Sequence, residues 1–74
     1  MHPTVKQQKE MIKLALKLQS KTGFHSSVEI QYKLHHPPVF DIGFYESGPK
    51  ATWSYFKTAE QVIAHICKRI KEVI

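Results

Sequence analysis

The chain has 74 residues, 42% of them hydrophobic and 23% charged, a composition typical of one small globular domain and not of a disordered segment. Its 11 basic and 6 acidic residues give a formal net charge of +5, which favours acidic partners such as nucleic acid or an acidic protein surface. A single cysteine, Cys67, excludes an internal disulfide and a zinc site built on cysteine pairs, and it favours a reducing, cytoplasmic compartment.

A first helix is predicted from Thr4 to Thr22. Thr4 and Gln7 fit a capping box, in which two side chains satisfy free backbone donors of the first turn. The interior is rich in good helix formers, and Gly23 supplies the left-handed residue that commonly ends a helix. At about 100° per residue, one sector of this helix collects five basic side chains, those of Lys6, Lys9, Lys13, Lys17 and Lys21.

This row of lysines has two interpretations. It can bind a phosphate backbone through contacts that weaken with salt, or it can be an ordinary solvated helix face. The opposite apolar arc is about 200° wide, which is more than one sheet can cover. Ile12 and Leu16 are therefore expected to pack against the last helix, or else to form an exposed patch for a partner or a second copy. A membrane-bound helix is disfavoured because the apolar arc is needed to cover the sheet.

Strands are predicted next. From Ser27 to Leu34 apolar and polar residues alternate, which is typical of a strand with one buried face. The segment His35-His36-Pro37-Pro38 then forms a turn or a strand edge, because proline cannot donate to a sheet ladder. Alternation resumes from Phe40 to Tyr45, before the turn cluster Glu46 to Lys50. Tyr45 falls on the solvated face, where it is a candidate stacking platform for bases or a peptide.

Ala51 to Phe56 makes the third strand. Trp53 and Tyr55 are predicted to point inward and Thr52 and Ser54 outward, because hiding an indole removes more apolar surface than hiding Phe56. Phe56 is then expected at the junction with the next helix.

The last helix is predicted to start at Thr58, with a second capping box through Gln61, and to run nearly to the C-terminus. One apolar stripe is expected from Val62, Ile63, Ile66, Ile70 and Val73. The other side is expected to carry His65, Lys68, Arg69, Lys71 and Glu72. Together these elements predict an α+β domain: a three-stranded antiparallel meander with two helices packed side by side on one face.

This order of elements resembles the double-stranded-RNA-binding domain, which also runs helix, three strands, helix, with both helices on one face. The resemblance implies RNA contacts from the first helix, from the loop between the first two strands, and from the start of the last helix. The lysines match the first region in kind. The second region reads His35-His36-Pro37-Pro38 in place of the family's glycine-proline-x-histidine pattern, and the third reads Lys57-Thr58-Ala59-Glu60-Gln61, with one lysine.

No catalytic or metal chemistry is expected. The sequence has no Gly-rich phosphate loop and no paired-carboxylate signature. Neighbouring side chains on extended backbone point to opposite faces, so His35 and His36 have poor geometry for one metal ion. Cys67 is expected to be a buried, inert thiol. The short apolar runs and the polar start of the chain predict neither a membrane span nor a secretory signal.

The sequence therefore predicts a small, basic, non-enzymatic binding module without a cofactor, either a monomer or a homodimer. Nucleic acid is the expected ligand, held by the lysine face of the first helix and by His35 and His36. The alternative is a protein-binding regulator: a small adaptor, or an inhibitor of the kind that phages and mobile elements encode.

Overall fold

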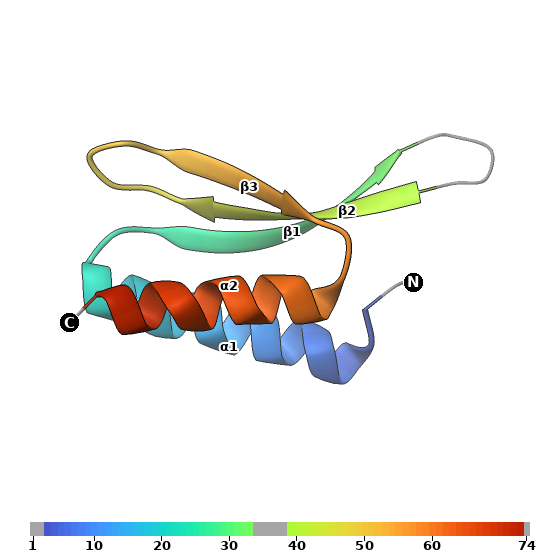
Figure 1. Cartoon of the computed structure of the whole chain (residues 1–74), viewed down its shortest axis with the longest axis horizontal. Coiled ribbons are helices and arrows are strands. Elements are labelled where there is room, and N and C mark those ends of the chain that lie inside the picture. Colours follow the sequence, from blue (N-terminus) through green and yellow to red (C-terminus); the bar gives the residue numbers. More distant parts are fainter. Residues whose placement is uncertain (1–2, 34–38, 74) are drawn as a thin grey trace.

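The computed structural model describes residues 3–33 and 39–73 and shows two layers, a sheet and a pair of helices (Figure 1). The α+β class and the order helix, strand, strand, strand, helix are confirmed. The elements are α1 (Val5–Thr22), β1 (Ser26–Lys33), β2 (Val39–Glu46), β3 (Thr52–Phe56) and α2 (Ala59–Glu72). Both helices lie on the same face of the sheet, and the other face stays open.

The sheet is an antiparallel meander in the order β1-β2-β3, so β1 and β3 are its two edges. Ile30 lies opposite Ile42 and Val28 opposite Phe44 in the first pairing. In the second pairing Ile42 lies opposite Phe56. Because side chains alternate between the faces of a sheet, these residues all point toward the helices.

Both predicted capping boxes are present. In α1 the Thr4 hydroxyl accepts a hydrogen bond from the Gln7 amide at 3.1 Å, and the Gln7 side chain accepts one from the Thr4 amide at 2.9 Å. Thr58 and Gln61 repeat this arrangement at the start of α2. Gly23 ends α1 with a φ of 78°, the left-handed conformation that favours glycine.

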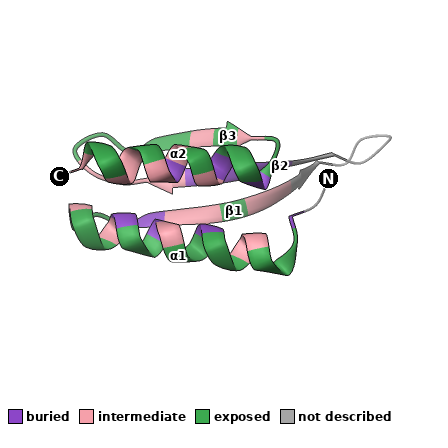
Figure 2. Ribbon diagram, turned by 60° about the horizontal axis from the view of Figure 1, so that its bottom comes forward, coloured by how far each residue is buried: buried purple, intermediate pink, exposed green. Residues whose placement is uncertain are grey.

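The core lies between the two layers (Figure 2). Full burial of one large apolar side chain stabilises a domain by about 1.5–3 kcal/mol, so a few such residues carry much of a small fold. A buried hydroxyl also ties the layers together, because Oγ of Ser26 in β1 donates to the Ala15 carbonyl of α1 at 2.7 Å. The buried apolar side chains are those of Met11, Ala15, Leu18, Ile42, Phe44, Ala59, Val62 and Ile66.

The predicted facing of β3 is wrong. Trp53 lies opposite Tyr45 and Tyr55 opposite Gly43, so both aromatic side chains point to the open face, where they are 44% and 56% exposed. Phe56 instead packs against the core. The reason lies in the neighbouring strand: Gly43 has no side chain, and the indole of Trp53 covers that position.

Two further expectations need correction. His65 was expected on the polar side of α2, but its ring packs against Phe44 and Phe56, with centroids 5.5 and 5.1 Å away. Ile12 and Leu16 do not pack on α2: they are 55% and 56% exposed, so the alternative of an exposed patch holds.

Candidate functional site

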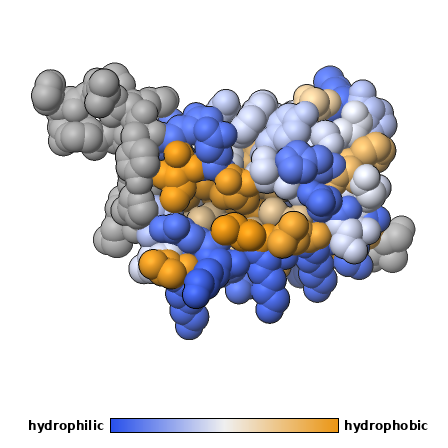
Figure 3. All heavy atoms as spheres, turned by 180° about the vertical axis from the view of Figure 1, so that it is seen from behind, coloured by the Kyte–Doolittle hydropathy of each residue, from blue (hydrophilic) through white to orange (hydrophobic). Residues whose placement is uncertain are grey.

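The lysine face of α1, which comprises Lys6, Lys9, Lys13, Lys17 and Lys21, is the first candidate surface. All five side chains are exposed. The opposite side of α1 faces the sheet and carries the buried residues Met11, Ala15 and Leu18. The lysines therefore point away from the sheet. Figure 3 shows hydrophilic side chains projecting along the lower edge of the molecule, below a hydrophobic band.

The charge of the chain is concentrated on α1. This helix carries five basic residues and one acid, Glu10, while the rest of the chain carries six basic and five acidic residues. The charges outside α1 therefore nearly cancel. Almost all of the formal net charge of +5 belongs to one helix face.

Cations outside α1 are partly used in ion pairs. Nζ of Lys57 lies 2.5 Å from Oδ1 of Asp41, whose side chain is buried on the open face of the sheet. Arg69 pairs with Glu46 and, at 3.2 Å, with Glu72.

The lysine face differs from these cations. Within residues 3–33 and 39–73, no carboxylate forms an ion pair with any of its five ammonium groups. Their charge is thus not neutralised by the fold, and it is available to an anionic ligand.

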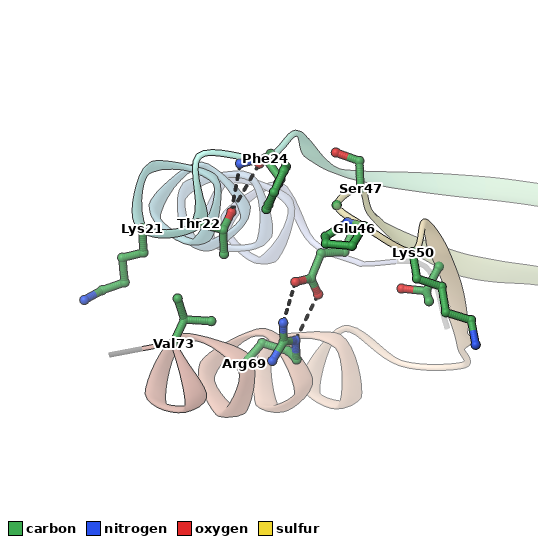
Figure 4. A pocket seen from close by; sticks show the side chains of 11 residues that line it. Lys21, Thr22, Phe24, Glu46, Ser47, Lys50, Arg69 and Val73 are labelled. Atoms are coloured by element: carbon green, nitrogen blue, oxygen red, sulfur yellow. Dashed lines mark hydrogen bonds and ion pairs between the residues drawn. The ribbon is translucent and has the colours of Figure 1, made fainter.

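The pair between Glu46 and Arg69 joins β2 to α2 (Figure 4). Nη2 and Nε of Arg69 donate to the two carboxylate oxygens of Glu46 at 2.6 and 3.0 Å, a two-pronged geometry that suits guanidinium groups. Hydrogen bonds to Glu46 and Glu72 raise the pKa of Arg69. The shallow pocket around this pair is also lined by Lys21, Phe24 and Lys50. The carboxylate in this pocket, that of Glu46, is already paired with Arg69.

A row of aromatic rings crosses the open face of the sheet. The ring centroids of Tyr45 and Trp53 are 5.1 Å apart, and those of Trp53 and Tyr55 are 6.1 Å apart with planes within 9° of parallel. His25 extends the row at 6.3 Å from Tyr45. The sequence prediction included Tyr45 but missed Trp53 and Tyr55, and the signal that could have found them is the glycine at 43 in the middle of β2.

The two surfaces lie on opposite sides of the domain, since the lysines point away from the sheet and the aromatic row lies on the sheet face away from the helices. A short rigid ligand therefore cannot contact both. The other two predicted binding residues, His35 and His36, lie outside the described residues.

Cys67 and His65 are the remaining candidate reactive groups. Cys67 is half-buried. Burial beside Phe44 and Phe56 lowers the pKa of His65, which favours its neutral form. In the part of the chain that the structure describes, no three histidine, cysteine or acidic side chains are grouped so that they could hold a metal ion. Neither described helix is long and apolar enough to cross a membrane.

Comparison of the chain with protein-family models, with curated proteins and with solved structures gives no match.

Proposed function

We propose that this chain is a small nucleic-acid-binding module that holds the phosphate backbone on the lysine face of α1. One observation carries the proposal: nearly the whole net charge lies on that face, and its lysines have no ion-pair partner among the described residues. Lysines that neutralise phosphates release condensed counterions, which is the main source of sequence-independent affinity for nucleic acid.

The dimensions of α1 suit such a ligand. From Lys6 to Lys21 the helix rises about 22 Å at 1.5 Å per residue. A nucleic-acid duplex carries about a dozen phosphate charges over that length. The five lysines can therefore contact a fraction of these phosphates.

Contacts of this kind position a protein on the backbone and carry no sequence information. We accordingly expect affinity with little base specificity. The resemblance to the double-stranded-RNA-binding domain, in which the first helix also contacts RNA, makes duplex RNA the first ligand to test. Membership of that family stays a prediction.

A titration with a labelled 20-base-pair RNA duplex, the corresponding DNA duplex and a single strand tests the proposal. The variant Lys13→Glu/Lys17→Glu should weaken duplex binding by about tenfold or more at low salt. Its matched control is Lys68→Glu/Lys71→Glu, which changes the net charge equally but at exposed positions of α2. Equal losses of affinity in the two variants, or no binding by the wild type, would contradict the proposal.

Protein binding is the second candidate function. The observation that favours it is the exposure of Ile12 and Leu16, which leaves apolar surface on α1 next to the lysine face. The kind of partner that we expect for this apolar surface depends on the adjacent sheet edge, which β1 forms.

A further inference from the structure

β1 presents a sheet edge with backbone groups that point outward. The His25 carbonyl accepts from the Ser47 amide at 2.9 Å, so the backbone groups of His25 face the β2 side. The next amide, that of Ser26, points the other way and donates to the Gln19 side chain at 3.1 Å. Backbone direction alternates along an antiparallel strand, so the groups of Val28 and Ile30 also point away from β2.

An apolar groove runs beneath this edge. Its walls are Gln8, Met11 and Ile12 of α1 and Val28 and Ile30 of β1, so that all but one of them are apolar. Leu16, one turn further along α1, extends the apolar surface, and more than half of its side chain is exposed. Figure 3 shows the resulting hydrophobic band between the sheet and the basic side chains of the helix.

The charge beside the groove is positive. On the helical surface Lys9 lies about 20° from Leu16 and about 60° from Ile12, and Lys13 lies about 60° from Leu16 on the same side. Both lysines are exposed, and a lysine side chain is long enough to place its ammonium group beyond the neighbouring apolar residues. A ligand that fills the groove therefore meets ammonium groups at its outer rim.

We propose that β1 receives an extended segment of an acidic partner protein as a fourth strand of the sheet. The segment pairs with the backbone of Val28 and Ile30, which is the usual way in which a peptide adds to an exposed edge. Its central helix-facing side chains are apolar and cover Ile12 and Leu16. Acidic side chains at its flanking helix-facing positions contact Lys9 and Lys13.

Charge complementarity selects this occupant over a second copy of the chain. A second copy would bring a second set of α1 lysines to the same groove, and like charges at close range disfavour that contact. This inference goes beyond the proposed nucleic-acid function, because it depends on the strand edge and the apolar groove.

The test is an amide NMR titration of the full chain with the synthetic peptide Glu-Thr-Val-Thr-Ile-Thr-Glu. This peptide places valine and isoleucine at central positions and glutamates at flanking positions of one strand face. We expect saturable shifts of the Val28 and Ile30 amides. The rearranged peptide Val-Thr-Glu-Thr-Glu-Thr-Ile has the same composition and charge, and it should bind about tenfold more weakly.

Two protein variants test the groove itself. Ile12→Gln/Leu16→Gln should weaken binding of the first peptide about tenfold, because it removes two exposed apolar side chains at the groove without a change of charge. Tyr55→Gln, at an equally exposed position on the open face, should bind as the wild type does. The amide spectrum of each variant also reports whether it is folded.

Three outcomes would overturn the proposal. Equal affinity for the two peptides would show that binding depends on charge alone and not on the apolar groove. Concentration-dependent shifts of Val28 and Ile30 without peptide would assign the groove to a second copy of the chain. Shifts of the same two amides on addition of duplex RNA would assign it to nucleic acid.

Discussion

Trp53 lies across Gly43 on the open face of the sheet, so close that a Cβ at position 43 would stand 3.1 Å from Cζ3 of the indole. The glycine thus provides the space in which the indole covers the sheet. Tyr45 and Tyr55 flank the indole and continue the aromatic row.

The first prediction concerns this contact. The substitution Gly43→Val places a branched side chain under the indole and should lift Trp53 into solvent, because the strand backbone cannot yield as easily as an exposed ring. Trp53 is the single tryptophan of the chain, so its emission should shift to longer wavelength. Thr52→Val places the same residue in β3, on the strand face opposite to the indole, and should leave the emission unchanged; a shift in both variants would contradict the account.

The second prediction uses the same tryptophan to locate the ligand. Nucleic acid bound to the lysine face of α1 lies on the far side of the domain from Trp53. Duplex RNA at saturation should therefore leave the emission of Trp53 unchanged. Strong quenching would place the ligand on the aromatic row instead, since stacked bases quench indole fluorescence.

The third prediction concerns the link between β2 and α2. Glu46→Gln removes the charged partner of a guanidinium whose side chain is only 31% exposed, and it should lower the free energy of unfolding by about 1–3 kcal/mol. Glu72→Gln removes the exposed partner of the same arginine, and it should lower the free energy of unfolding by about 0.5 kcal/mol or less. Urea unfolding measures both, and equal losses would show that the Glu46 contact is no stronger than a surface ion pair.

The fourth prediction is a pH dependence. Burial lowers the pKa of His65 below the ordinary histidine value of 6.5, so the unfolded chain binds a proton more readily than the folded one. The stabilisation is complete above pH 6.5 and is lost as the pH falls below it. The negative charges of Glu46 and Glu72 oppose this shift, while the positive charges of Arg69 and Lys68 add to it.

The matching measurement is urea unfolding at pH 7.5 and pH 5.5. The wild type should be less stable at the lower pH, and His65→Gln should show a smaller loss. A wild type that is equally stable at both pH values would refute the role of His65.

The parts of the fold that depend on local chemistry could be predicted from the sequence. Thr4, Thr58 and Gly23 act on the backbone next to them, so both helix starts and the end of α1 follow from a few neighbouring residues. The facing of β3 could not be predicted in this way. It depends on which residue of β2 lies opposite, and the space above Gly43 exists only once the two strands are paired.

The same distinction between local sequence and packing applies to the candidate surfaces. Helical periodicity places the five lysines on one side of α1, and the structure leaves them exposed. The exposure of Ile12 and Leu16 depends on where α2 lies, and the burial of His65 depends on Phe44 and Phe56 in other elements. Such properties arise from packing between distant segments, which a pattern within one segment does not contain.

The dependence of duplex RNA affinity on salt tests the central claim most directly. If the lysine face holds the phosphate backbone with three to five contacts, a plot of log K against log salt concentration should have a slope of about −3 to −4.5. The variant Lys13→Glu/Lys17→Glu should have a slope shallower by about two, whereas Lys68→Glu/Lys71→Glu should keep that of the wild type. A slope near zero, or one that the α1 substitutions leave unchanged, would contradict the account.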